Sequence, residues 1–494
     1  MTALLAATPL VVILLGMGVL RRSAAVAGAA GLAVALILAL TIFRLSADGP
    51  GGDLRAGAAT FAEALHTTAT ILWIILPALA IFEYQRRVGA IERIRQFLAA
   101  MADDRRIQAM LIAWFFALFM EGAAGFGTPV ALAAPLLVGL GYAPVRALSL
   151  ALLGHAAGVS FGAVGTPVLA QVAVTGLGAG DIAIRTALLH ALAGPVLLVL
   201  MVRLAGNTPL SRSDLSWSAL AALSFFVPSV ALAYLTGPEL PTLGGALLGM
   251  AIFVVLLRRA RPGGMPDVRR LLPDLAPYLV VLVLVLATRL IGPARDALSD
   301  LALTWSLDGR FGGTFEPFYH PGTILFLGFF AGALFTGRGR FIGPALAAAA
   351  RRLLPVAIAL FVMLALSRLM VHAGMVEAIA SAASGVGPAW PLIAPAVGVL
   401  GTFITGSATA SNILFSEFQL SIAAGLTLSP AAIAAGQSFG AAIGNIIAPH
   451  NIIAGGATVG LSGREGEILA RTAWPCAIYA GIGGAALFIL SLPS

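Results

Sequence analysis

The phrase AAGVSFGA at 156–163 returns as AAGQSFGA at 434–441, with seven of its eight letters unchanged and an offset of 278 residues. A second glycine-broken apolar stretch precedes each copy, EGAAGFGTPVA at 121–131 and TGSATASN at 405–412. Further upstream, VGAIE at 88–92 matches AGMVE at 373–377. Interrupted hydrophobic segments at matching positions in two halves are typical of secondary transporters. The duplication therefore predicts two similar halves around one shared site.

The composition predicts that lipid surrounds much of the chain. Hydrophobic residues make up 60% and charged residues 10% of the 494 residues, and no soluble core could absorb so much apolar surface. The chain has a net charge of +8 but no lysine. Its arginines cluster beside apolar spans, which favours cytoplasmic loops over nucleic-acid binding as the reason for the positive charge. Cys476 is the single cysteine, so an intramolecular disulfide and a cysteine-built metal site are excluded. The first apolar run has no preceding basic residue and is expected to be a retained span, not a signal peptide.

Placing the arginine clusters in the cytoplasm gives one consistent topology. The clusters are Arg21–Arg22, Arg86–Arg87 with Arg105–Arg106, Arg258–Arg270 and Arg338–Arg352. The resulting spans are 3–20, 24–43, 66–84, 146–175, 183–204, 218–236, 242–258, 275–293, 322–337, 353–370, 430–458 and 472–490. Segments 107–141 and 388–424 have arms too short for two full crossings and are predicted to be re-entrant hairpins.

The expected fold is an all-α polytopic membrane protein with about 12 transmembrane helices, two re-entrant hairpins and broken helices at the site. Its divisions are a first inverted repeat (1–205), a two-span linker (206–270) and a second inverted repeat (271–494). Segments 146–175 and 430–458 are the broken helices, and 294–320 is expected to be an external loop that could contain a short helix. Both termini are predicted to lie outside.

Helices broken inside the membrane expose backbone N–H groups at one end, where an anion can bind without a cationic side chain. Glycines allow close approach of a ligand, and Pro129 and Pro167 can restart the following helices. Small residues are also common in membrane helix packing, but their recurrence in both halves favours a site. The candidate binding residues are Gly125, Gly127, Thr128, Ser160, Gly162, Thr166, Ser407, Thr409, Ser411, Asn412, Gln437, Ser438 and Asn445.

Ionisable residues inside a membrane are costly and suggest function. The candidates for carrying a coupled proton are Glu121 first, then His155, with Glu417 in the other hairpin. The alternative for Glu121 is a capping or backbone hydrogen bond, and for His450 a packing role. The remaining cations near span ends are expected to snorkel to the interface, although one of them could bind a carboxylate. They are Arg146, Arg368, Arg464 and Arg471.

Several stretches resemble the lactate permease family, in the order typical of that family. They are EGAAGFGTPVALAAPLLVGLGYAP (121–144), FGAVGTPV (161–168), GPELP (237–241), TGSATASNILF (405–415) and APHNIIAGGATVGLSGREG (448–466). The resemblance covers nearly the whole chain. It implies a bacterial inner-membrane symporter that takes up lactate, and often glycolate, with protons. The chain departs from the family pattern at Ala408, where members commonly carry Asp or Asn, and at His155, near which many have Asn.

The leading functional hypothesis is a proton-coupled importer of small 2-hydroxymonocarboxylates, with no cofactor and no metal. A sodium-coupled carrier of another organic anion is the alternative, because tip carbonyls and hydroxyls could ligate a hard cation. A membrane-embedded enzyme would require a motif such as HExxH, which is absent, or a GxSxG elbow between a strand and a helix. The sequences GVSFG (158–162) and GQSFG (436–440) match GxSxG, but they lie in the apolar repeated phrase and not on a strand-turn-helix. A scaffold would not require duplicated polar breaks. The oligomeric state stays open, with a homodimer as one candidate.

Overall fold

Long apolar helices make up nearly all of the structure. The computed structural model describes residues 2–20, 22–43, 45, 52–101, 104–125, 127–261, 268–308 and 311–491. Within these ranges, 12 helices are long and apolar enough to cross a bilayer. The prediction of about 12 spanning helices is therefore confirmed, and the chain is a multi-pass membrane protein. Arg21 and the side chain of Arg270, from the predicted arginine clusters, lie outside the described part.

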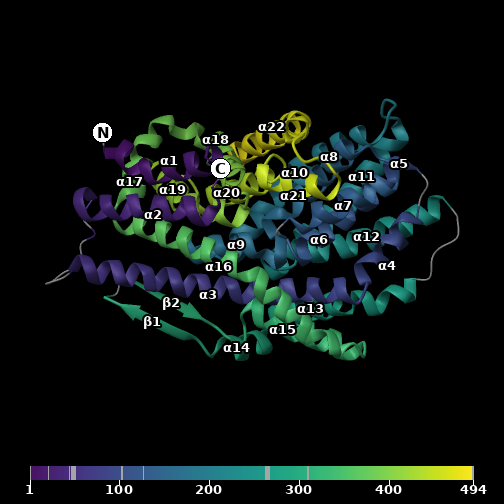
Figure 1. Ribbon diagram of the computed structural model, residues 1–494, viewed down its shortest axis with the longest axis horizontal. Helices are drawn as coiled ribbons and strands as arrows, with labels where there is room; N and C mark the ends of the chain where they lie inside the picture. The colour runs from purple at the N-terminus through teal and green to yellow at the C-terminus, as the bar shows by residue number, and fades with distance from the viewer. Residues whose placement is uncertain are drawn as a thin grey trace.

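The first half of the chain consists of helices only (Figure 1). Two helices and a very long third one precede a two-armed hairpin, an interrupted segment and a final long helix. These elements are α1 (Thr2–Gly18), α2 (Ala24–Leu38) with a π-helical end (Ala39–Phe43), α3 (Gly52–Arg87), α4 (Ala90–Ala99), α5 (Arg105–Ala109) continued by the π-helix η2 (Met110–Phe116) and α6 (Ala117–Ala123), α7 (Thr128–Gly139), α8 (Pro144–His155), the 3-10 helix η3 (Ala156–Phe161), α9 (Gly162–Thr175) and α10 (Ala179–Ala205).

Two linking helices lead into the second half. They are α11 (Arg212–Thr236) and α12 (Pro241–Ala260). The second half comprises η4 (Val268–Leu271), α13 (Leu272–Leu290), α14 (Gly292–Ser299), strands β1 (Leu303–Leu307) and β2 (Phe311–Phe315), α15 (Pro321–Phe335), η5 (Gly339–Phe341), α16 (Ile342–His372), α17 (Met375–Ala383), η6 (Ser384–Ala389), α18 (Trp390–Thr405), α19 (Ala408–Gly425), α20 (Pro430–Gly444), α21 (Pro449–Thr458) and α22 (Glu465–Leu490).

The second half repeats the element order of the first. α3 and α4 correspond to α16 and α17, and each pair is joined by a left-handed glycine, Gly89 with φ 71° and Gly374 with φ 73°. Because glycine adopts this conformation at no steric cost, the VGAIE and AGMVE motifs encode the same helix corner. A hairpin, an interrupted segment and one long helix follow each corner. α3 and α16 pack side by side along the molecule (Figure 1). The opposite membrane orientation of the two halves stays a prediction.

Helix lengths differ in detail from the predicted spans. α1 and α15 have 17 and 15 residues, below the ~20 needed for a straight crossing. α3 begins at Gly52, well before the predicted start at residue 66. Pro321 fixes the start of α15, and the left-handed Gly337 follows its end, which explains why that helix is short.

The predicted external loop 294–320 contains a β-hairpin as well as the short helix α14. β1 and β2 pair antiparallel, with Leu303 opposite Phe315 and Leu307 opposite Phe311. Asp308 has a positive φ of 54° at the turn. The Asp-Gly pair at 308–309, between runs of β-branched and aromatic residues, is the sequence signal for this hairpin.

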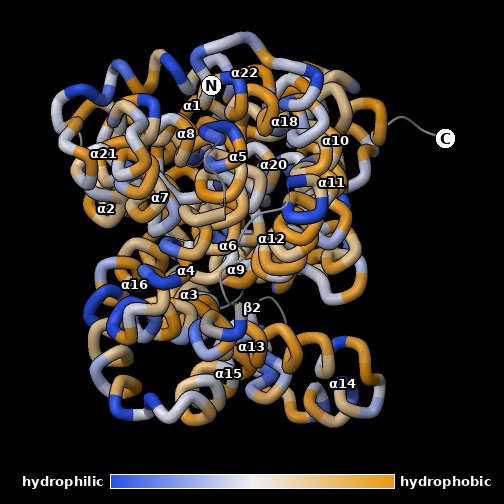
Figure 2. The backbone as a smooth tube through the Cα atoms, turned by 90° about the vertical axis from the view of Figure 1, so that its right-hand side faces the viewer, coloured by the Kyte–Doolittle hydropathy of each residue, from blue (hydrophilic) through white to orange (hydrophobic). Residues whose placement is uncertain are grey.

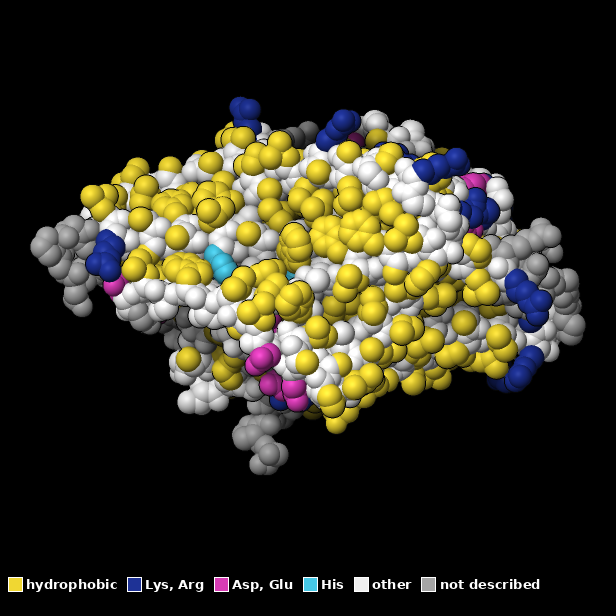
Figure 3. Space-filling view, turned by 90° about the horizontal axis from the view of Figure 1, so that it is seen from below, with side chains coloured by type: hydrophobic (Ala, Val, Ile, Leu, Met, Phe, Trp, Pro, Cys, Tyr) yellow, Lys and Arg dark blue, Asp and Glu magenta, His cyan; other side chains and the backbone are white. Residues whose placement is uncertain are grey.

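Arginines from separate predicted cytoplasmic loops converge on shared carboxylates. Glu83 pairs with Arg87 at 2.6 Å and with Arg352 at 2.9 Å. Arg93 and Arg338 approach Asp274 at 2.6 and 3.0 Å. Figure 3 shows arginines at the edges of a broad apolar face, and Figure 2 shows hydrophobic residues predominating along most of the helices. This distribution suits a lipid-embedded protein.

The Asp274 cluster should contribute measurably to stability. Asp274 is fully buried, so Asp274→Ala would leave Arg93 and Arg338 without their shared carboxylate. Because both arginines are partly exposed, we expect a loss of about 2 kcal/mol, less than for a fully buried pair. Thermal unfolding of the detergent-purified protein measures the loss. Asp296→Ala, at a carboxylate that is 70% exposed, is the matched control and should leave the melting temperature unchanged.

Candidate anion-binding site

The two outer ends of the first hairpin, which runs from α5 to α7, lie next to each other. The Tyr142 hydroxyl donates a hydrogen bond to the Arg105 carbonyl, and Arg105 Nη2 donates to the Gly141 carbonyl at 3.2 Å. At the opposite end, between α6 and α7, Gly125 and Gly127 have φ values of 57° and 76°, which favour glycine. The two outer ends of this hairpin therefore lie together, and its re-entrant placement in the membrane stays a prediction.

The first interrupted segment contains an unusual backbone. α8 ends at His155, η3 follows, and Ala163, Val164 and Gly165 then have φ values of 43°, 54° and 82°. A β-branched residue rarely adopts left-handed φ, so the surrounding packing must hold Val164 there. Regular helix resumes near Pro167. The predicted interruption thus occurs within the predicted stretch.

The second hairpin has the same form as the first. Trp390 Nε1 donates to Gln419 Oε1 at 2.8 Å, and Gln419 Nε2 donates to the Ala394 carbonyl at 3.0 Å, which joins the outer ends of α18 and α19. Gly406, with φ 68°, forms the tip, and Ser407 caps α19 by accepting a bond from the Ala410 amide.

The second interrupted segment breaks later than its counterpart. The repeated phrase at 434–441 lies inside the continuous helix α20, and the break falls between α20 and α21. A proline restarts the helix in both halves, but Pro167 follows the first copy by four residues and Pro449 the second by eight. The two copies nevertheless touch at the same position, because Ser160 Oγ donates to the Ser438 carbonyl at 3.0 Å.

The four breaks form a closed ring of contacts. Glu121 Oε1, at the first tip, lies directly against Gly162 of the first break. Asn412 Nδ2, just past the second tip, donates to the Pro167 carbonyl at 3.0 Å.

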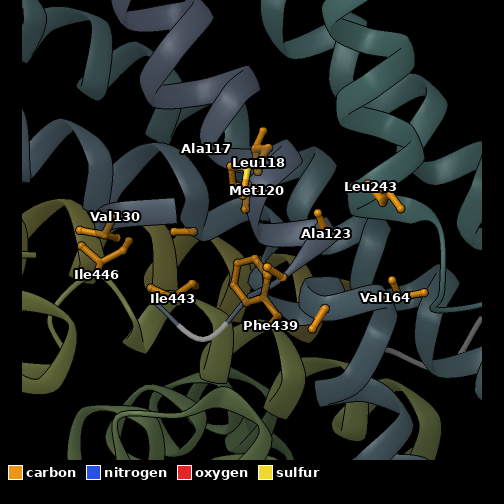
Figure 4. Packing of buried hydrophobic residues seen from close by; sticks show 14 of the residues in the cluster. Ala117, Leu118, Met120, Ala123, Val130, Val164, Leu243, Phe439, Ile443 and Ile446 are labelled. Atoms are coloured by element: carbon orange, nitrogen blue, oxygen red, sulfur yellow. The ribbon is translucent and has the colours of Figure 1, made fainter. Parts of the chain in front are cut away.

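Two further contacts complete the ring. Gly406 of the second tip packs against His450 of the second break, and Asn451 of that break lies beside Gly127 of the first tip. Figure 4 shows apolar residues of the same region, with Val130 of α7 next to Ile446 of the second break. Breaks far apart in sequence therefore meet in one place.

Four helices begin at this ring: α7 at Thr128, the regular part of α9 near Pro167, α19 at Ala408 and α21 at Pro449. Helix N-termini carry a partial positive charge and unpaired N–H groups. Their convergence makes an environment that favours an anion without any lysine or arginine.

The predicted binding residues fall into two groups, those at the tips and breaks of the ring and those that serve helix packing. In the first group, the residues at the first tip and break are Gly125, Gly127, Thr128, Gly162 and Thr166. Ser407, Thr409, Asn412 and Asn445 lie at the second tip and break. Asn412 Oδ1 is buried and has no hydrogen-bond partner among the described residues.

The second group of predicted binding residues serves helix packing and comprises Ser160, Ser411, Gln437 and Ser438. Ser411 Oγ donates to the Gly398 carbonyl at 3.0 Å, and Gln437 Nε2 donates to Ser411 Oγ at 3.2 Å. Ser160 and Ser438 join η3 to α20. Ala408, the departure from the family pattern, is buried with Val159, Ala441 and Ala442.

The candidate proton carriers occupy different places. Glu121 lies at the ring, and no hydrogen bond joins its carboxyl to another described residue. His155 Nδ1 donates to the Ala151 carbonyl of its own helix at 2.8 Å. Glu417 instead lies 3.7 Å from Arg368, in an ion-pair cluster outside the ring. Arg146 binds Asn207 and Arg464 binds Glu467 near helix ends.

Sequence reasoning missed a buried chain of polar groups behind the ring. The Tyr479 hydroxyl donates to His190 Nδ1 at 2.7 Å, and His190 Nε2 donates to Ser160 Oγ at 2.9 Å. All three side chains are almost fully buried. His190 and Tyr479 stand alone in apolar helices without a motif, so only the contact with Ser160 identifies them.

Comparisons with known proteins agree with this architecture. The sequence profile of the L-lactate permease family matches residues 2–267 and 310–492. The L-lactate permease of Streptococcus iniae is 30% identical, over 87% of this chain and 92% of its own. The glycolate permease GlcA of Escherichia coli K12 is 28% identical, over 98% and 94%. The L-lactate permease of Bacillus subtilis 168 is 27% identical, over 96% and 92%.

Two solved structures share the fold at low sequence identity. MtrF of Neisseria gonorrhoeae, from a class of antimetabolite efflux pumps, has a TM-score of 0.54 at 16% identity, covering 97% of each chain. The YdaH transporter of Alcanivorax borkumensis, which has an unusual topology, has a TM-score of 0.55 at 14% identity, covering 95% of this chain and 98% of its own. Together, the family match along nearly the whole chain and the curated permease relatives show that this chain belongs to the L-lactate permease family.

Proposed function

We propose that the protein imports small 2-hydroxymonocarboxylates, lactate or glycolate, by proton symport across the bacterial inner membrane. The observation that carries this proposal is the meeting of four helix N-termini at one ring of broken segments. The names of its relatives, L-lactate permeases and a glycolate permease, support the substrate class. These relatives are transporters, and we propose no enzymatic activity.

In this proposal the substrate carboxylate binds backbone N–H groups at the starts of α7, α9, α19 and α21. The 2-hydroxyl binds neutral side chains of the ring, such as Thr128, Thr166 and Asn412. A pocket that forms hydrogen bonds to a hydroxyl discriminates strongly against analogues that lack it. Propionate should therefore bind far more weakly than lactate.

Glu121 is the proposed carrier of the coupled proton. Its carboxyl lies against Gly162, in the break that precedes the regular part of α9, so its charge acts on the region proposed for the substrate carboxylate. Two like charges so close repel each other. Protonation of Glu121 would therefore favour anion binding, and anion binding would favour protonation, which is the coupling that symport requires. His155 is the second candidate.

Alternating access would arise from movement of the hairpins and broken segments relative to the remaining helices. An inverted repeat supplies two related arrangements of the same elements, one open to each side. This scheme places the arginine-rich loops in the cytoplasm and both termini outside.

A sodium-coupled carrier of another organic anion is the second candidate. α6, α18 and α20 end at the ring, so their terminal carbonyls lie beside the N-termini. Carbonyl and hydroxyl oxygens are the ligands that hard cations prefer.

Uptake into proteoliposomes decides between the two coupling ions. We expect labelled lactate to accumulate under an inward proton gradient with sodium absent, and unlabelled glycolate to compete. Propionate should compete poorly. Accumulation that requires an inward sodium gradient would contradict proton symport, and absence of lactate transport under either gradient would contradict the substrate.

Glu121→Gln tests the coupling site. The variant removes the exchangeable proton but keeps the shape of the side chain, so it should abolish accumulation driven by a proton gradient. Exchange of internal for external lactate should persist, because exchange requires no net proton release. Undiminished accumulation in the variant would show that another residue carries the proton.

Gly162→Ala tests the backbone site. The added methyl group would overlap the Glu121 carboxyl and displace it. We expect at least about a tenfold loss of lactate affinity, equivalent to about 1.4 kcal/mol, measured by calorimetry on purified protein. Gly139→Ala at the end of α7, where the methyl group meets no neighbour, is the control and should bind normally. Equal affinity for both variants would exclude Gly162 from the site.

A further inference from the structure

A charge cluster outside the ring connects four separate elements. His372 Nε2 on α16 donates to Glu63 Oε2 on α3 at 2.8 Å. Arg368, one helical turn earlier on α16, lies 3.6 Å from Glu63 and 3.7 Å from Glu417 on α19. Phe311 of β2 packs against the His372 ring at 4.6 Å between centroids. We call Glu63, Arg368, His372 and Glu417 the latch cluster.

Arg368 donates its hydrogen bonds to a fifth element, the C-terminal end of α9. Its Nη1 and Nη2 atoms donate to the carbonyls of Val174 and Ala173 at 3.0 and 2.8 Å. These are among the last carbonyls of α9. The C-terminal end of a helix carries a partial negative charge, which favours a cationic side chain there. The guanidinium therefore holds the C-terminus of α9 by hydrogen bonds and the two carboxylates by charge alone.

The helices held by the latch cluster are those that reach the ring. α9 and α19 both begin at the ring and pack against each other, and Asn412 of α19 donates to the Pro167 carbonyl of α9. Arg368 and Glu417 connect the same two helices farther along, toward their C-termini. A change in the latch cluster therefore acts on the relative position of two walls of the site.

The charges of the latch cluster do not balance. Glu63 and Glu417 contribute two negative charges, Arg368 contributes one positive charge, and His372 is uncharged unless protonated. The side chains are 10 to 20% exposed. Glu377 on α17 is the other charged group that acts on Glu417, and it is exposed, so water screens it. One bound proton would neutralise the excess charge, and removing net charge from a poorly solvated place is favourable.

We propose that the latch cluster is a second proton-binding site, distinct from Glu121, at which one proton loosens α19 from Arg368 and α9. The proton comes from water and binds the Glu417 carboxylate, with no other bond formed or broken. The Glu417–Arg368 attraction is then lost, while the hydrogen bonds of Arg368 to α9 remain. Hairpin 2, formed by α18 and α19, becomes free to move. The inference rests on the proposed transport function for its purpose, but its direct test does not require transport.

Hydrogen–deuterium exchange of the α19 peptide 408–425 in the purified protein, corrected for intrinsic exchange rates, tests the latch. In the wild-type protein, protection should fall on going from pH 8 to pH 6, by about tenfold for each pH unit in which the cluster titrates. Glu417→Gln mimics the protonated form and should give low protection at both pH values. Glu63→Gln should reduce the pH dependence in the same way.

Glu377→Gln is the matched control, since Glu377 also faces Glu417 but forms no ion pair with Arg368 among the described contacts. It should behave like the wild-type protein. Retention of the full pH dependence in Glu417→Gln, or its absence in the wild-type protein, would overturn the proposal. Protection that responds to sodium at constant pH and loses this response in Glu417→Gln would also overturn it, since the cluster would then bind a metal cation.

Equilibrium exchange of labelled lactate, with equal pH on both sides of the vesicle, separates this proposal from the proposed function. Exchange should slow with rising pH in the wild-type protein, and it should slow less in Glu417→Gln, in which only the proposed Glu121 site still links exchange to pH. Failure of lactate exchange together with a pH-dependent α19 would refute the substrate assignment and leave the latch supported. Lactate exchange with a pH-independent α19 would refute the latch alone.

Discussion

Backbone groups freed by helix breaks must find partners inside the protein, and the centre of this structure depends on that constraint. A bilayer offers no water to unpaired N–H and C=O groups, so non-helical backbone persists there only when protein or a cavity surrounds it. Here the breaks support one another. Asn412 satisfies the Pro167 carbonyl, Ser160 satisfies the Ser438 carbonyl, and Thr242 Oγ1 at the start of α12 donates to the Gly158 carbonyl at 2.7 Å. These bonds connect both halves and the linker, so the two repeats cannot separate without exposing buried polar backbone.

The same bonds leave the helix N-termini available. Carbonyls at the first tip and first break accept bonds from Thr128 and Thr166, while four helices start at the ring. A binding site for a small carboxylate then requires no positive side chain, and such a site avoids the cost of burying a lysine or arginine. The charged residues lie elsewhere, in clusters such as those of Glu83, Asp274 and Arg368, which join helices of the two halves.

Much of this arrangement could be predicted from the sequence because repetition and glycine carry strong local signals. Both hairpin tips and the first break lie where their motifs predict, and the matching motifs at 88–92 and 373–377 both form a helix corner at a left-handed glycine. The position of the second break could not be predicted from the repeated phrase, because the proline that restarts the helix has moved to Pro449. The β-hairpin was missed because its short strands lie within a polar loop. His190, Tyr479, Glu63 and His372 were missed because their roles depend on contacts between residues 30 or more positions apart, for which one sequence has no signal.

The central claim is that breaks from both halves form one anion site, and a structure with a heavy-atom substrate analogue tests it most directly. The protein bound to 3-bromolactate should show the anomalous bromine signal inside the ring bounded by Gly127, Gly162, Ser407 and Asn445, with the carboxylate at the helix N-termini. A bromine position outside that ring, with the ring closed by protein side chains, would contradict the account.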